Sequence, residues 1–148
     1  MTSGNTVRID FHSSLGMLEF VQMVSDHIAR MVGLDDDSIH WVGLAIRESV
    51  INAIKHGNCN DVRKRVHVEF TSLQDAGGPG LAVRVRDEGC GFDPATVADP
   101  LATENLLKAS GRGIFLMRSF MDEMTFRQAA EGGMEVRMIK RVPQSTLA

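Results

Sequence analysis

The stretch RVHVEFTSLQDAGGPGLAVRVRD, residues 65–87, decides how this chain folds. Its two ends, residues 65–73 and 81–87, alternate apolar and polar side chains, as a strand with one buried face does. The segment between them is rich in glycine and contains a proline, which is typical of a tight turn. The stretch therefore predicts an antiparallel hairpin.

A short strand and a helix are expected upstream of this hairpin. Residues 7–11, VRIDF, alternate like a strand, and residues 15–32 form a helix that ends at Gly33. The apolar residues of the helix recur at spacings of four and three, which favours burial against a sheet and leaves a dimer or partner surface as the alternative. They are Met17, Val21, Val24, Ile28 and Met31.

A second helix is expected over residues 39–56, stopping at Gly57. The preceding segment LDDDS supplies acidic residues and cap candidates, with Ser38 one option. The apolar residues that can form its core stripe are Val42, Ala45, Ile46, Ala53 and Ile54.

Downstream of the hairpin, a long irregular segment (89–113) leads into a helix over residues 114–124. A second hairpin closes the chain, with strands TFRQA and MEVRMIKRV around the turn EGG, and residues 143–148 form a frayed tail. This order predicts an α+β two-layer sandwich, a mixed, largely antiparallel sheet covered on one face by helices. Strands and helices do not alternate, which excludes a Rossmann pattern.

Composition narrows the classes of protein. The chain has 148 residues, 43% of them hydrophobic, which suits a single domain over residues 1–148 with a proper core. Its formal net charge is -3 and it has no basic run, which argues against nucleic acid as a partner. No stretch is apolar enough to span a bilayer and the N-terminus is polar, so no membrane contact and a cytoplasmic location are expected.

Glu48 and Asn52 stand four residues apart on the second helix and therefore share a face. A carboxylate and an amide oxygen one turn apart suit a hard cation such as Mg²⁺, and the carboxylate can also deprotonate a nucleophile. Taken alone, the pair is more typical of a solvated helix face.

Asp87 ends a strand, and Gly89 and Gly91 follow it. A carboxylate there can accept a hydrogen bond from an exocyclic amine such as adenine N6, and the glycines would let the backbone approach a flat base. Taken alone, this segment is a glycine-containing turn.

Gly111 and Gly113 come directly before the helix expected from residue 114. Free backbone N–H groups at a helix start can cradle a phosphate, although the pair is also a common flexible entry to a helix. The loop before it, about residues 93–112, is longer than most connections, which indicates a lid or disorder.

The order of these three segments resembles the Bergerat-fold ATPases, the GHKL-type superfamily of gyrase and sensor histidine kinases. RESVINAIKHGN is similar to the N box, DEGCGF to the first glycine box and SGRGIFLM to the second. The likeness extends from Val7 to about Arg141 and is greatest to the small stand-alone anti-sigma-factor serine/threonine kinases. They share E-x-x-x-N-A-x-x-H-G, D-x-G-x-G-F-D and G-x-G-I-x-L-M-R-x-x-M-D-E.

The resemblance implies a role for each matching residue. Glu48 would be the general base that takes the proton of the substrate hydroxyl, and Asn52 would coordinate the Mg²⁺ that accompanies ATP. Asp87 would bind the adenine amine. The remaining expected ATP-binding residues line the base or wrap the phosphates: Gly89, Gly91, Lys108, Gly111, Arg112 and Gly113.

The chain departs from the family pattern at two places. Met134 follows Gly133 where members often carry threonine, and Lys108 and Arg112 stand in for an arginine late in the lid. The main expectation is a kinase that phosphorylates a serine or threonine of an antagonist protein in a partner-switching system. The alternative is a non-catalytic ATP-binding module that sequesters a sigma factor or another regulator. A homodimer is also implied by the resemblance.

Overall fold

The computed structural model describes residues 2–89, 117–129 and 132–143. Two short turns accompany the regular elements, a 3-10 turn at Leu15–Met17 and a π turn at Ala53–Gly57. In chain order the helices and strands are β1 (Thr2–His12), α1 (Leu18–Val32), α2 (Asp36–Asn52), β2 (Arg65–Asp75), β3 (Gly78–Arg86), β4 (Glu123–Gln128) and β5 (Met134–Arg141).

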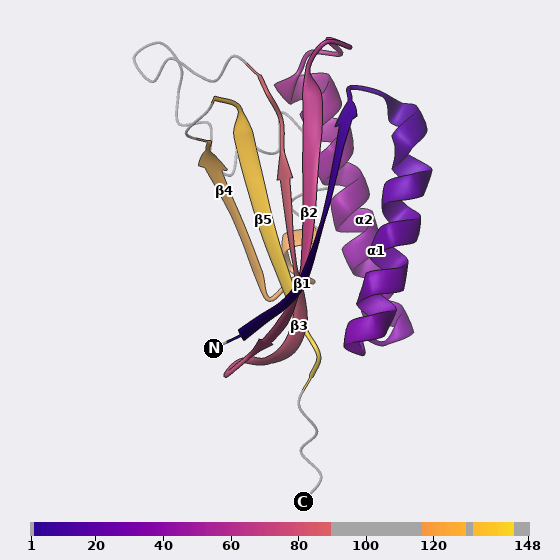
Figure 1. Ribbon diagram of the computed structural model, residues 1–148, viewed down its shortest axis with the longest axis vertical. Coiled ribbons are helices and arrows are strands. Elements are labelled where there is room, and N and C mark those ends of the chain that lie inside the picture. The colour runs from indigo at the N-terminus through magenta and orange to yellow at the C-terminus, as the bar shows by residue number, and fades with distance from the viewer. Residues whose placement is uncertain (1, 90–116, 130–131, 144–148) are drawn as a thin grey trace, which may run out of the picture.

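The described strands form one sheet in the order β1-β2-β3-β5-β4, and α1 and α2 cover one of its faces (Figure 1). The expected hairpin is confirmed: β2 pairs with β3 in a register that sets Phe70 opposite Val83 and His67 opposite Arg86. The second hairpin, β4 with β5, is confirmed too. The two-layer α+β class is therefore correct, and every pairing among the described strands is antiparallel.

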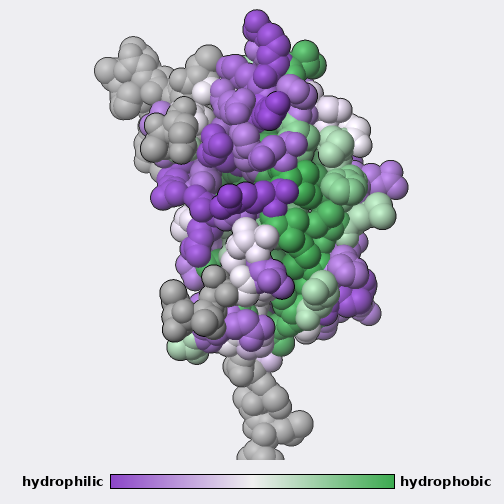
Figure 2. Space-filling view, in the orientation of Figure 1, coloured by the Kyte–Doolittle hydropathy of each residue, from purple (hydrophilic) through white to green (hydrophobic). Residues whose placement is uncertain are grey.

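The core lies between the helices and the inner face of the sheet. Val68 and Phe70 of β2 and Val83 of β3 pack there against Val21 of α1 and Ile46 of α2, each at most 1% exposed. All five residues expected to form the core stripe of the second helix are buried. Figure 2 shows the hydrophobic residues as a band along the seam between sheet and helices. None of the helices in the described residues is both long and apolar enough to cross a membrane.

The apolar stripe expected on the first helix is only partly correct. Met31 is 69% exposed, while the small residues Ser25 and Ala29 are fully buried. The other four residues of the stripe are in the core or packed against it, so the spacing misplaced only Met31. Gln22 Nε2 of α1 donates to the carbonyl of Gly43 of α2 at 3.2 Å.

Several element boundaries also differ from expectation. α2 begins three residues early because Asp35, rather than Ser38, is its N-cap, with the Asp35 carboxylate accepting from Ser38 N at 2.7 Å. The prediction of a helix over residues 114–124 extends the helix too far, since β4 starts at Glu123. Asp122 N already donates to Ile139 O of β5 at 2.9 Å, so the chain has joined the sheet by that point.

The open face of the sheet carries a row of ion pairs that crosses all five strands. Arg8 pairs with Glu69, Arg84 bridges Glu69 and Glu135, and Arg127 pairs with Glu135. Burial opposes ionisation of Glu135, but hydrogen bonds from the two arginines outweigh it and lower its pKa. A hollow of about 400 Å³ lies on this face, opposite the helices, and is therefore separate from the residues singled out on α2.

Candidate functional site

Glu48 and Asn52 lie one turn apart on α2, both half-buried, as the helical period requires. Glu48 makes no hydrogen bond or ion pair with any described residue, so none of the polar contacts among them depends on its carboxylate. Asn52 Nδ2 is buried without a hydrogen-bond partner in the described part of the chain. A buried amide with an unused donor is costly, which points to a ligand at this position.

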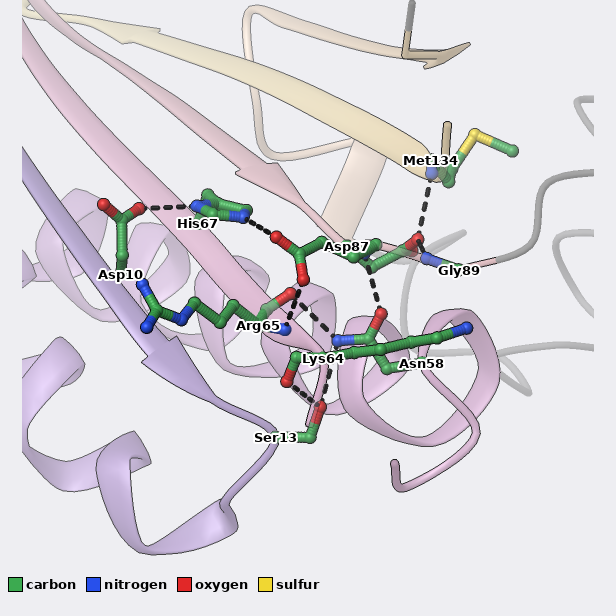
Figure 3. Close-up of polar contacts among 10 residues, drawn as sticks. Asp10, Ser13, Asn58, Lys64, Arg65, His67, Asp87, Gly89 and Met134 are labelled. Atoms are coloured by element: carbon green, nitrogen blue, oxygen red, sulfur yellow. Dashed lines mark hydrogen bonds and ion pairs between the residues drawn. The ribbon is translucent and has the colours of Figure 1, made fainter. Parts of the chain in front are cut away.

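Asp87 is the most enclosed of the candidate residues, at 4% exposure. Its Oδ1 accepts from the backbone N–H groups of Gly89 at 2.9 Å and Met134 at 3.0 Å (Figure 3). Its own N–H donates to the carbonyl of Met134 at 3.1 Å. Oδ2 receives no hydrogen bond from the described residues. One carboxylate oxygen is thus tied in place and the other is available to a donor such as an amine.

Burial raises the pKa of Asp87 above its ordinary value of 3.8, and the hydrogen bonds from Gly89 and Met134 oppose that rise. The protein therefore keeps a desolvated carboxylate at the end of β3. Such a group gains more from a hydrogen-bond donor than an exposed carboxylate does, because water does not compete for it.

Three glycines close around Asp87. A Cβ on Gly57 would overlap the Asp87 carboxylate, and one on Gly133 would overlap its backbone carbonyl. Gly133 also has a φ of 87°, which favours glycine. A Cβ on Gly89 would overlap the carbonyl of Gly57. These contacts place the turn of Asp87 against the π turn that follows α2, the helix that carries Glu48 and Asn52.

Position 57 is a glycine for a different reason from the helix termination that the sequence predicted. A glycine that ends a helix usually has a left-handed φ, but here the left-handed residues are Cys59, at 53°, and Asn60, at 59°. The helix instead widens into the π turn Ala53–Gly57. Gly57 is required because the Asp87 carboxylate occupies the space that its side chain would fill.

Five of the expected site residues, and the expected lid at about 93–112, fall outside the described residues. These are Gly91, Lys108, Gly111, Arg112 and Gly113. Their assignment stays a prediction.

Two functional contacts escaped the sequence reasoning. The backbone of Met134 both donates a hydrogen bond to Asp87 and accepts one from it. The side chain of Asn58, close to Asp87, forms hydrogen bonds with Ser13, Arg65 and Glu88. A backbone contact leaves no trace in residue type, so only the adjacent Gly132-Gly133 pair could have indicated a close approach. Because the contact with Asp87 is made by the backbone of Met134, it would form equally well if threonine stood at this position.

The described residues contain no cluster of three or more His, Cys, Asp or Glu side chains that could hold a metal ion. The side-chain oxygen of Asn52, rather than its NH₂ group, suits a different arrangement, in which Mg²⁺ keeps its waters, takes one or two protein ligands and is otherwise held by phosphates.

Replacing Gly57 by alanine tests the contact between α2 and Asp87. The added methyl group would displace the carboxylate and break its bonds to Gly89 and Met134, so we expect ATP affinity to fall at least tenfold and stability to fall by about 1–3 kcal/mol. The control is Gly16→Ala, where the nearest atom to an added Cβ is 3.4 Å away and neither property should change. Calorimetric titration with ATP and thermal unfolding measure both; an unchanged ATP affinity in Gly57→Ala would contradict the geometry.

Comparison with known proteins adds two kinds of finding. The family model described as a histidine kinase-like ATPase domain matches residues 12–140. The anti-sigma F factor of Oceanobacillus iheyensis is 31% identical over 111 residues, covering 74% of this chain and 73% of that protein. The serine-protein kinase RsbW of Bacillus subtilis is 30% identical over 129 residues, covering 81% of this chain and 75% of that protein.

Proposed function

Since the chain belongs to the histidine kinase-like ATPase family, as its three sequence boxes led us to expect, we propose that it is an ATP-dependent serine/threonine protein kinase of the anti-sigma-factor type. It would act in a partner-switching system and phosphorylate an antagonist protein. The observation that carries the proposal is the buried Asp87 carboxylate, which accepts from two backbone N–H groups through one oxygen, while the other receives no hydrogen bond from the described residues.

Each described candidate residue has a role in this reaction. Oδ2 of Asp87 accepts a hydrogen bond from the N6 amine of adenine, which selects ATP over nucleotides that carry an oxygen there. The half-buried Glu48 takes the proton from the substrate hydroxyl while the oxygen of that hydroxyl attacks the terminal phosphorus of ATP and ADP leaves. Asn52 would hold Mg²⁺ through its side-chain carbonyl oxygen.

When bound, Mg²⁺ neutralises the charge of the phosphates, which is the main chemical contribution of a metal in phosphoryl transfer. The chain contributes position: Asn52 and Glu48 share one rigid helix face, and Asp87 is fixed against the end of that helix. The phosphate-binding roles of Lys108, Gly111, Arg112 and Gly113, and base lining by Gly89 and Gly91, belong to the same proposal.

The partners follow from the relatives. Anti-sigma F factor and serine-protein kinase RsbW are names of proteins to which this chain is similar, and they support a sigma factor and a phosphorylatable antagonist as its partners. A homodimer and a cytoplasmic location, where sigma factors act, are part of the proposal.

The second candidate function is a non-catalytic ATP-binding module that sequesters a sigma factor or another regulator. Met134 favours it, because a methionine side chain cannot supply the hydroxyl that threonine would bring to the nucleotide. The presence of Lys108 where members carry arginine favours it too, since lysine is a point charge rather than a bidentate fork.

One experiment separates these functions. The purified protein is incubated with Mg²⁺, ATP labelled on its terminal phosphate, and a candidate antagonist protein from the same organism. Its melting temperature is measured with and without Mg-ATP. A kinase transfers label to a serine or threonine of the antagonist. A binding module gains stability, about 2.7 kcal/mol at ATP one hundred times above Kd, and transfers nothing. No shift and no transfer would exclude both.

A further inference from the structure

Asn58 is a fully buried polar residue, 0% exposed, directly after the π turn that ends α2. Its backbone N–H donates to the carbonyl of Ala53 at 2.8 Å, which fastens it to the end of the helix that carries Glu48 and Asn52. A buried amide side chain costs stability unless its hydrogen bonds are made, so its partners define its task.

The side chain of Asn58 joins three segments of the sheet (Figure 3). Nδ2 donates to Ser13 Oγ, after β1, and to the carbonyl of Arg65, at the start of β2, both at 3.0 Å. Oδ1 accepts from the backbone N–H of Glu88, after β3, at 2.7 Å. A carbonyl only accepts and a backbone N–H only donates, so these partners allow one orientation of the amide.

The bond to Glu88 N–H matters because of which peptide it holds. That N–H belongs to the peptide group that follows the Cα of Asp87, while the peptide group before it is held by Asp87 N–H donating to Met134 O at 3.1 Å. With both flanking peptides fixed, the backbone dihedrals of Asp87 are fixed, and so is the direction in which its carboxylate leaves the backbone.

Glu88 is also held from the other side, by β2. Its Oε1 accepts from Arg65 N–H at 2.8 Å and its Oε2 lies 2.7 Å from His67 Nε2, and these two contacts lower the pKa of Glu88. They anchor the side chain to the sheet. Among the described residues, Asn58 Oδ1 is the side-chain atom that ties the backbone of this turn to the end of α2.

From this geometry we infer that Asn58 is a positioning residue for base recognition, which keeps Oδ2 of Asp87 aimed at the adenine amine. The inference rests on the proposed function, because it presumes that ATP binds at Asp87. Asn58 touches no nucleotide; it acts through Glu88 N–H on the residue that does. Losing the hydrogen bond between Asn58 and Glu88 N–H should therefore reduce selectivity for the base while leaving the phosphate contacts unchanged.

The test measures dissociation constants of ATP and of inosine triphosphate, which has a carbonyl oxygen in place of the N6 amine, both with Mg²⁺. The variants are Asn58→Ala, which removes all three hydrogen bonds, and Asn58→Asp, which keeps an acceptor for Glu88 N–H. Leu73→Ala is the control for lost stability, since Leu73 belongs to a separate small hydrophobic cluster with Ala82 and Ile139.

Wild type should bind ATP at least tenfold more tightly than inosine triphosphate. In Asn58→Ala that ratio should fall to about one, through weaker ATP binding at unchanged inosine triphosphate binding. Asn58→Asp should retain the ratio although its melting temperature falls, and Leu73→Ala should do the same. If Asn58→Ala does not fold, a lost ratio in Asn58→Asp overturns the inference.

The outcomes separate this inference from the proposed function. A wild-type protein that binds neither nucleotide contradicts the function itself. A wild type that prefers ATP, together with an Asn58→Ala variant that keeps the full ratio, leaves the function intact and overturns the inference. Equal weakening of both nucleotides in Asn58→Ala means a purely structural role and overturns it as well.

Discussion

Asp87→Asn is expected to weaken ATP binding about a hundredfold while the protein stays folded. Asparagine keeps an oxygen that can accept from Gly89 and Met134, but it places an NH₂ group where the free carboxylate oxygen stood. Two donors then face each other at adenine N6. The loss of a charge-assisted hydrogen bond and the unpaired donors together amount to about 3 kcal/mol, or a hundredfold in affinity.

The same variant should be at least as stable as wild type at neutral pH. Because burial raises the pKa of Asp87 in the folded state, the folded protein holds a proton more tightly than the unfolded chain. The ionised carboxylate therefore costs stability above the raised pKa, and this cost disappears as the pH falls through that value towards the ordinary 3.8. The stability advantage of Asp87→Asn should shrink over that range.

Calorimetric titration with Mg-ATP and thermal unfolding between about pH 4 and pH 8 measure both effects. Inosine triphosphate provides a matched control, since its base oxygen can accept from the new asparagine and its affinity should not fall. A variant that binds ATP as well as wild type does would remove Asp87 from the nucleotide site.

Glu48→Gln should slow phosphate transfer about 10²- to 10⁴-fold while leaving ATP binding within about twofold of wild type. Glutamine has nearly the same shape but cannot take a proton, and a general base contributes about 10² to 10⁴ in rate. Glu48 is half-buried and has no hydrogen bond or ion pair with the described residues, so the fold does not depend on its charge.

Single-turnover transfer of labelled phosphate to the antagonist measures the rate directly, separated from product release. Glu19→Gln is the matched control, because Glu19 is an exposed glutamate in the first turn of α1 and should transfer at the wild-type rate. Transfer by Glu48→Gln at that same rate would assign the base to another residue. No transfer by wild type favours the binding module instead.

The sequence predicted best what depends on local periodicity. The hairpin over residues 65–87 followed from alternation along two short runs, and the shared face of Glu48 and Asn52 followed from the helical period. The boundaries of the helices and strands were predicted less accurately. Asp35 and Ser38 are both capable caps, and which of them accepts a hydrogen bond depends on the backbone at the helix start.

The environment of Asp87 could not be predicted in the same way. Its partners are Met134 and Gly57, which lie far from it in the chain and meet it only because β5 pairs with β3 and α2 ends beside them. The strand order that brings β5 between β3 and β4 is a property of the whole sheet, and no local pattern contains it.

The sequence by itself determined the family and the α+β class, and it singled out Glu48, Asn52 and Asp87 as candidates, because side-chain type and spacing carry that information. Only the tertiary structure decided which oxygen of Asp87 is left for a ligand, why Gly57 must lack a side chain, and that Asn58 holds the turn. Those properties depend on backbone N–H groups, carbonyls and close contacts between distant segments. Any residue type can supply a backbone group, so chain folding, and not composition, places them.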